Sequence, residues 1–110
     1  MTDSTNTAGT LPTPTLHAEN GVLTLEGLPL TQIAEQFDTP TYVYSKAALA
    51  SAFEAWKQAL SGRKALVCYA VKANSNLGIL SVFAQLGAGF DIVSGGELAR
   101  VLAAGGRADR

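Results

Sequence analysis

The chain has 110 residues, a formal net charge of −1 and a single cysteine. This length allows one small domain or part of a larger one. The charge gives no basic footprint for nucleic acid or an anionic membrane, and one cysteine excludes an intrachain disulfide framework and a cysteine-based zinc cluster. No apolar run approaches the roughly 20 residues that span a bilayer, and the first residues lack the basic start and apolar core of a secretory signal. We therefore expect a cytoplasmic protein with no nucleic-acid or membrane partner and no metal.

The first third of the chain predicts a tail followed by a hairpin. Residues 1–15 are rich in Thr, Ser, Asn, Gly and Pro. Such a segment has too little apolar surface to offset the entropy of ordering, so we expect it to be flexible. From Leu16 to Leu30, short apolar alternations are separated by Asn20-Gly21 and by Gly27. Asn-Gly between such runs is typical of a β-hairpin.

The next segment predicts a short helix and then a strand. Thr31 is a candidate N-cap for a helix over residues 32–37, which ends before Thr39-Pro40. Residues 41–44 (TYVY) are β-branched or aromatic, a composition that favours a strand.

A longer helix follows, for which Ser45 is the predicted N-cap. Within it Leu49, Phe53, Trp56 and Leu60 recur at helical spacing and form one apolar stripe. We therefore expect both aromatic side chains of this stripe in the core, and Ser61-Gly62 to end the helix.

The second half of the chain alternates strands and helices with short links, which predicts parallel βαβ units. Its first strand is a near-continuous apolar run, typical of a parallel strand buried on both faces. The expected order is a strand over residues 65–71, a helix over 76–86 capped by Gly87, a strand over 90–93 and a helix over 94–104 ended by Gly105-Gly106.

Two parallel strands alone leave both edges of their sheet open. A closed (β/α)₈ barrel takes about 250 residues. The sequence therefore predicts an α/β fold that is incomplete in this chain, so that the chain is a fragment of a longer protein.

Lys72 stands where the first apolar run of this half ends and small and polar residues begin. In α/β folds, ligands and catalytic groups gather at the C-terminal ends of the strands. A lysine amine must be neutral to attack an aldehyde, and burial of the ammonium favours the neutral form. Such a lysine can hold pyridoxal phosphate (PLP) as a Schiff base. On position alone, however, a solvent-exposed lysine that merely ends a strand is the more common case.

Two strand-end motifs change this balance. Residues 69–76 (YAVKANSN) and 89–98 (GFDIVSGGEL), together with residues 39–44 (TPTYVY), resemble the diaminopimelate decarboxylases, a group of fold type III PLP-dependent enzymes. The resemblance extends from about residue 22 to the end of the chain. It implies a PLP-binding barrel and a second, mainly β domain. Residues 16–45 would contribute to the β domain, and residues 46–110 would form the first part of the barrel.

The resemblance also implies roles for single residues. Lys72 matches the Schiff-base lysine, Ser94 lies at the next strand end as a cofactor-binding candidate, and Asp91 and Glu97 match acidic positions near that lysine. An acid beside the freed amine can stabilise its ammonium form and help it to transfer protons. Glu97 has a structural alternative, because residues 94–97 form a capping box. We expect Cys68 to be a core residue rather than a nucleophile, since it lies inside a strand without a neighbouring histidine.

The implied activity is the decarboxylation of meso-2,6-diaminopimelate to L-lysine and CO₂, the last step of lysine biosynthesis, by a full-length homodimer. We expect the chain alone to be inactive, because the family's other cofactor- and substrate-binding groups lie beyond Arg110. An ornithine or arginine decarboxylase, an alanine racemase and a non-catalytic PLP-binding homeostasis protein stay open as alternatives. The racemase pattern has a tyrosine soon after the lysine motif, where Ser75-Asn76 stand here, and the homeostasis proteins are single barrels without a strand-rich lead-in.

Overall fold

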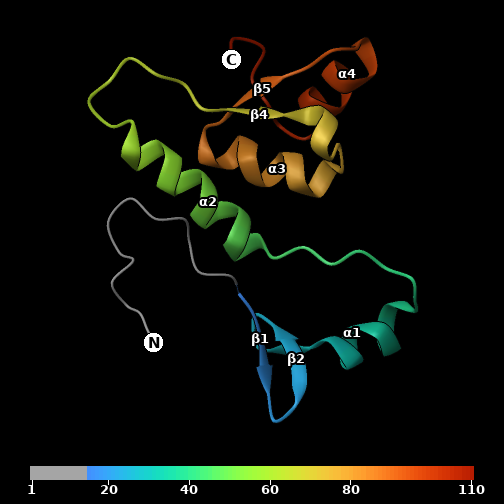
Figure 1. Cartoon of the computed structure of the whole chain (residues 1–110). Coiled ribbons are helices and arrows are strands. Elements are labelled where there is room, and N and C mark those ends of the chain that lie inside the picture. Colours follow the sequence, from blue (N-terminus) through green and yellow to red (C-terminus); the bar gives the residue numbers. More distant parts are fainter. Residues whose placement is uncertain (1–14) are drawn as a thin grey trace.

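The computed structural model describes residues 15–110, so the expected flexible tail over residues 1–15 lies almost entirely outside the described residues. A three-stranded sheet with one helix is joined through a coil to a two-stranded sheet with three helices (Figure 1). In the described part of the chain no helix is long and apolar enough to cross a membrane. The elements in chain order are β1 (Leu16–Glu19), β2 (Val22–Leu25), β3 (Leu28–Pro29), α1 (Leu30–Phe37), α2 (Lys46–Ala59), β4 (Cys68–Ala70), the 3₁₀ turn η1 (Val71–Ala73), α3 (Leu77–Leu86), β5 (Gly89–Asp91) and α4 (Gly95–Ala103).

Two tight turns shape the antiparallel sheet β1-β2-β3. Asn20 and Gly21, with φ of 52° and 79°, connect β1 to β2. Positive φ at both central residues is the signature of the turn that matches the twist of a hairpin. Glu26 and Gly27, with φ of 51° and 82°, connect β2 to β3 in the same way. The predicted hairpin is therefore confirmed.

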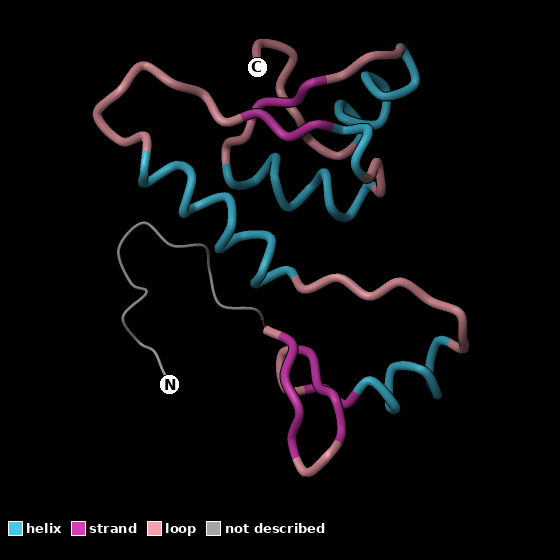
Figure 2. The backbone as a smooth tube through the Cα atoms, viewed as in Figure 1, coloured by secondary structure: helices cyan, strands magenta, loops and turns pink. Residues whose placement is uncertain are grey.

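The segment after β3 differs from the sequence-based expectation in two places. Helix α1 begins at Leu30 with Pro29 at its N-cap position, so the prediction of Thr31 as N-cap is wrong. The helix starts earlier because β3 leads directly into it and the φ of −61° at Pro29 already suits a helix start. The predicted strand over residues 41–44 is also wrong: it is coil, visible as the long loop in Figure 2, and Tyr42 is 89% exposed. High strand propensity did not suffice, since no described strand pairs with this segment.

Helix α2 has the predicted N-cap, because the Ser45 hydroxyl accepts a hydrogen bond from the Ala48 N–H at 3.0 Å. Phe53 is buried and its ring lies 6.2 Å from that of Phe83 in α3, as expected for the apolar stripe. Trp56 is 59% exposed, so the prediction that it belongs to the core is wrong. Its side chain instead lines a cavity together with Cys68 of β4.

Strands β4 and β5 pair in parallel, with Ala70 opposite Asp91, and α3 connects them. Asn76 caps the start of α3 by accepting a hydrogen bond from the Gly78 N–H, and Gly87 ends the helix in the left-handed conformation with φ of 91°. The predicted order of strand, helix, strand and helix is confirmed.

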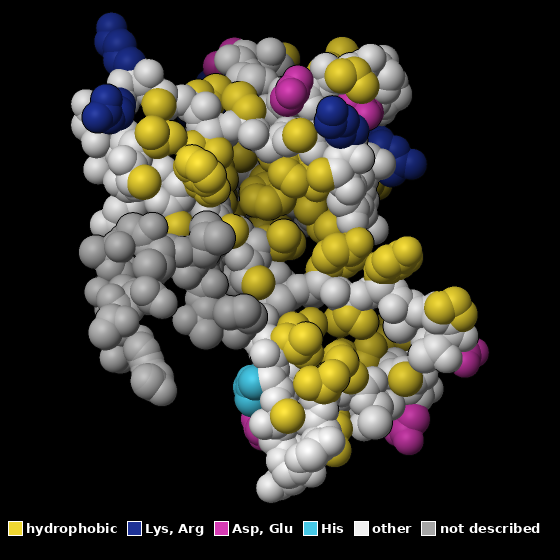
Figure 3. All heavy atoms as spheres, viewed as in Figure 1, with side chains coloured by type: hydrophobic (Ala, Val, Ile, Leu, Met, Phe, Trp, Pro, Cys, Tyr) yellow, Lys and Arg dark blue, Asp and Glu magenta, His cyan; other side chains and the backbone are white. Residues whose placement is uncertain are grey.

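The core lies between this parallel sheet and its helices. Leu80 and Val71 are completely buried, and hydrophobic side chains gather over the same part of the molecule in Figure 3. The other members of the buried cluster are Phe53, Ile79, Phe83, Ala88, Phe90 and Val101.

Strand β4 is shorter and less covered than the sequence suggests. Only Cys68–Ala70 pair as a strand, and the Cys68 thiol is exposed, so the predictions of a strand buried on both faces and of a core cysteine are wrong. The reason is that β4 has β5 as its one partner among residues 15–110, which leaves its other edge open. Across the pair, Cys68 lies over Gly89, where an added Cβ would stand 2.6 Å from Sγ.

The Glu26 carboxylate joins the hairpin to the start of α2. Glu26 Oε2 accepts hydrogen bonds from the Ser45 hydroxyl at 2.5 Å and from the Ala47 N–H at 3.2 Å. It thereby satisfies a backbone N–H in the first turn of a helix that Ser45 also caps. The hydrogen bond from Ser45, and after it that from Ala47, lower the pKa of Glu26 below its ordinary value of 4.5.

This pKa shift predicts a pH-dependent contribution to stability. Because the pKa of Glu26 is lower in the folded than in the unfolded state, its stabilisation is fully present above pH 4.5 and is lost as the pH falls through the folded value. In urea titrations of the complete protein, Glu26→Gln should unfold at lower urea than wild type at neutral pH, and the gap should close in acid. Glu35→Gln is the matched control, since Glu35 is exposed and makes no side-chain hydrogen bond within residues 15–110. A gap of constant size at every pH would contradict this assignment.

Candidate active site

The C-terminal ends of β4 and β5 bring the predicted site residues to one edge of the sheet. Lys72 follows Ala70, the last residue of β4, and Ala70 pairs with Asp91, the last residue of β5. The predicted strand over residues 90–93 placed Asp91 near its start, but β5 runs from Gly89 to Asp91 and so ends on this residue. Ser94 and Glu97 follow Asp91 at the start of α4.

Lys72 lies in the single 3₁₀ turn η1 immediately after β4. The Asn74 N–H closes this turn on the Val71 carbonyl at 3.1 Å, and the Val71 side chain anchors it in the core. Lys72 itself is exposed, so residues 15–110 do not supply the burial that the sequence-based argument invoked for its amine. Within these residues its Nζ makes no hydrogen bond or ion pair, which leaves the amine accessible.

Two side chains that the sequence did not single out hold the loop that follows Lys72. The Tyr69 hydroxyl donates to the Asn74 carbonyl at 2.9 Å, and its ring stacks on Phe83 at 4.5 Å. Arg100 Nη1 donates to the Ser75 carbonyl at 3.3 Å, which links α4 to the same loop. Burial raises the pKa of Tyr69 above its ordinary value of 10.0. The signal for Tyr69 was a hydroxyl inside an apolar run, which needs a partner when it is partly buried.

Glu97 and Ser94 form the predicted capping interaction. The Ser94 hydroxyl accepts a hydrogen bond from the Glu97 N–H at 3.1 Å, and Glu97 Oε1 accepts one from the Val93 N–H at 2.8 Å. Asp91 is exposed. Among the described residues neither acid forms an ion pair with Lys72, so the structure brings both acids to the same edge as the lysine without pairing either with its amine.

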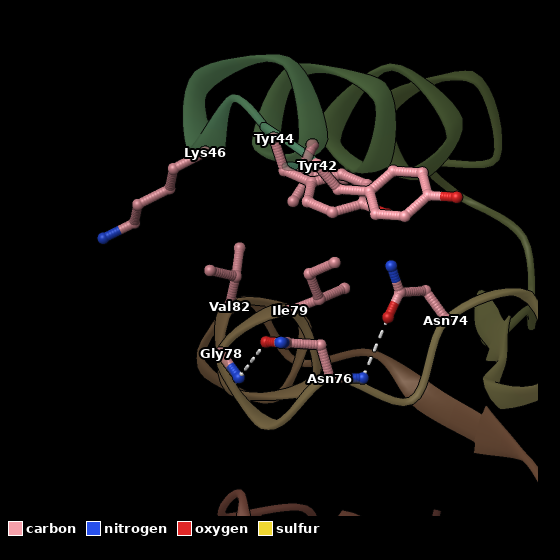
Figure 4. A pocket seen from close by; sticks show the side chains of 9 residues that line it. Tyr42, Tyr44, Lys46, Asn74, Asn76, Gly78, Ile79 and Val82 are labelled. Atoms are coloured by element: carbon pink, nitrogen blue, oxygen red, sulfur yellow. Dashed lines mark hydrogen bonds between the residues drawn. The ribbon is translucent and has the colours of Figure 1, made fainter. Parts of the chain in front are cut away.

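A cavity of about 620 Å³ lies beside the lysine loop but outside this group (Figure 4). Tyr42 and Tyr44, from the coil before α2, lie across it from Asn74 and Asn76, and Lys46 extends away from the two asparagines. The Asn74 side chain accepts from the Asn76 N–H at 2.9 Å, so it serves to organise the start of α3. The full lining is Tyr42, Tyr44, Lys46, Leu49, Asn74, Asn76, Gly78, Ile79 and Val82, which includes none of the predicted site residues.

The donor set at the strand ends suits an organic cofactor with an aldehyde. A primary amine condenses with an aldehyde, and Lys72 presents such an amine on a turn that is anchored on both sides. Metal chemistry has less support, because residues 15–110 contain no group of three or more His, Cys, Asp or Glu side chains that could hold an ion.

Comparison with known proteins agrees with this geometry. Residues 46–110 match the family described as pyridoxal-dependent decarboxylase, pyridoxal binding domain. The chain is 63% identical over 90 residues to a diaminopimelate decarboxylase of Pseudomonas fluorescens. It superposes on a crystal structure from Aquifex aeolicus with a TM-score of 0.79 at 46% identity, and on M. jannaschii diaminopimelate decarboxylase in complex with L-lysine with a TM-score of 0.68 at 36% identity.

The chain spans about a fifth of the length of these proteins. The matches cover 82% of this chain but 22% of the Pseudomonas enzyme, and 84% of this chain but 23% of the Aquifex structure. They confirm the expected α/β fold as the N-terminal part of a PLP-binding barrel, and they identify PLP as the cofactor. With most of its described residues inside the matched region, the chain belongs to the pyridoxal-dependent decarboxylases.

Proposed function

We propose that the complete protein decarboxylates meso-2,6-diaminopimelate to L-lysine and CO₂. The observation that carries this proposal is the accessible Lys72 amine at the C-terminal edge of the parallel sheet, in a chain that is similar to several proteins of that name. The identity of 63% to the Pseudomonas fluorescens diaminopimelate decarboxylase supports the substrate, as does the L-lysine bound to the M. jannaschii structure.

In this proposal Lys72 holds the cofactor through its amine. The primary amine of Lys72 would be the group that holds the cofactor's aldehyde. PLP, when bound, takes up the electron pair that remains on the substrate carbon as CO₂ departs. With its amine free, Lys72 could carry a proton to that carbon.

The neighbouring polar groups have supporting roles. Asp91 lies at the same sheet edge, where its carboxylate would attract the freed Lys72 amine. Glu97 can act in the same way, because Oε1 serves the helix cap and Oε2 stays available. Ser94 accepts one hydrogen bond from the Glu97 N–H, which leaves its hydroxyl proton to donate to the cofactor.

The proposal extends to the organisation of the complete enzyme. Residues 16–45 contribute to a mainly β domain and residues 46–110 begin the barrel, with Glu26 bridging the two through Ser45 and Ala47. The enzyme is a homodimer in the cytoplasm, a compartment whose reducing conditions suit the exposed free thiol of Cys68.

Competing turnover of amino acids tests this function. The complete enzyme should release CO₂ from meso-diaminopimelate with a kcat/KM on the order of 10⁴-fold above that for ornithine or arginine, because a site built to bind the distal amino-acid group rejects substrates that lack it. The 110-residue chain alone should show no measurable release. Preference for ornithine or arginine, or racemisation of alanine without CO₂ release, would assign another member of the same fold.

A further inference from the structure

The Tyr69 hydroxyl closes a loop around Lys72. Tyr69 lies in β4 before the 3₁₀ turn, and Asn74, whose carbonyl accepts its hydrogen bond at 2.9 Å, lies directly after the turn. A second bond, from the Asn74 N–H to the Val71 carbonyl at 3.1 Å, lies inside this loop. Both polar groups of the Asn74 main chain are thus occupied, and the lysine lies between the two anchor points.

Tyr69 is itself held in place by the core. Its ring stacks on that of Phe83 with centroids 4.5 Å apart and an interplanar angle of 23°. Phe83 is buried on α3, the helix that continues from the lysine loop. The hydroxyl is therefore attached to a rigid support rather than to a mobile side chain.

We propose that Tyr69 is a positioning residue that fixes the turn on which Lys72 meets the cofactor. The inference rests on the proposed function, in which Lys72 bonds to PLP. An exposed lysine on a loose turn would sample many orientations, and each orientation away from the aldehyde would slow bond formation. The hydrogen bond from Tyr69 removes much of this freedom before the cofactor arrives. Since Asn74 accepts it through the main chain, Tyr69 is the one partner whose side chain can be changed.

Tyr69→Phe in the complete protein tests this role, because it retains the ring stacked on Phe83 and deletes only the hydroxyl. PLP is added to apoprotein, and samples are reduced with borohydride at intervals. Mass spectrometry then follows the Lys72 peptide. Attachment should slow by on the order of three- to tenfold, the loss typical of one hydrogen bond. The pH at which the visible absorbance of the bound cofactor changes should also shift.

Thr24→Val is the matched control. It too deletes a hydroxyl that donates to a main-chain carbonyl, that of His17 at 3.1 Å, but in the β-hairpin. Thr24→Val should lower the Tm about as much as Tyr69→Phe does, because each variant loses one hydrogen bond. Unlike Tyr69→Phe, it should leave the rate of PLP attachment to Lys72 unchanged. Equal rates for wild type, Tyr69→Phe and Thr24→Val would overturn the positioning role and leave Tyr69 a purely structural residue.

The result that would refute the proposed function differs from the result that would refute the positioning role alone. If wild-type protein attaches no PLP to Lys72, the proposed function fails and the positioning role with it. If the Tyr69→Phe protein does not fold, hydrogen exchange on the wild-type apoprotein tests the inference instead. Exchange at the Asn74 amide should then be slow. Exchange at the rate of an open coil would show that the turn is not held, and would overturn the inference.

Discussion

Replacing Lys72 with alanine in the complete enzyme should abolish covalent attachment of PLP and lower decarboxylation by about 10⁴-fold or more, since bond formation and proton transfer are lost together. Lys72 is the one lysine of residues 15–110 at the C-terminal edge of the parallel sheet. Lys46 and Lys57 lie on α2, and Lys64 lies in the loop that precedes β4. None of them can replace an amine placed at the end of β4.

The measurement combines absorbance with reduction. Wild-type protein should show a visible band that borohydride removes, with the added mass on the Lys72 peptide, and Lys72→Ala should show neither. Lys72→Arg retains the positive charge but cannot form the bond, so it should fail in the same way. Lys64→Ala, which removes an exposed lysine away from the strand ends, should behave as wild type. A reducible band that persists in Lys72→Ala would assign the attachment to another residue.

The second large effect concerns stability. Leu80→Ala should reduce the free energy of unfolding by about 2–5 kcal/mol, the range for truncating a fully buried leucine. Leu80 is 0% exposed in the centre of the cluster that α3 shares with the parallel sheet. The cost has two parts: the apolar surface no longer removed from water, and the cavity that the rigid neighbours leave open.

Leu77 provides the comparison on the same helix. It is 46% exposed in the first turn of α3, so Leu77→Ala should cost no more than about 1 kcal/mol. Denaturant unfolding of the complete protein, followed by far-UV circular dichroism, measures both variants. Equal losses would mean that residues outside the described chain cover Leu77 as well, and would refute the distinction drawn here between a buried and an exposed position.

The sequence predicted those features that depend on neighbouring residues. Asn20-Gly21 indicated a tight turn because few residues accept positive φ, and the turn is present. Ser45 indicated a helix start for a similarly local reason: its hydroxyl satisfies an N–H of the same helix. Apart from the N-cap of α1, the errors concern contacts between distant segments. Burial of Trp56 and Cys68 depends on what covers the open edge of β4, and no local pattern encodes that.

The same distinction applies to the site. Lys72 was recognisable because its own side chain has the chemistry and because its motif resembles a known one. The partners of Tyr69 and Arg100 were not recognisable, since both side chains donate to main-chain carbonyls, and every residue type carries such a carbonyl. For a hydrogen bond of this kind, the sequence reveals only the donating side chain and not the main-chain group that accepts.

Glu26 also has a consequence for how this protein can be engineered. Its φ of 51° lies in the left-handed region, where asparagine or glycine is the usual choice and a long side chain is uncommon. A redesign that chose the residue at position 26 by backbone conformation alone would substitute Asn or Gly. That substitution would relieve the backbone strain in the β2–β3 turn. It would also withdraw the carboxylate from Ser45 and Ala47, so a local improvement would loosen the joint between two parts of the chain. The strained residue is the one that a stabilising library should leave unchanged.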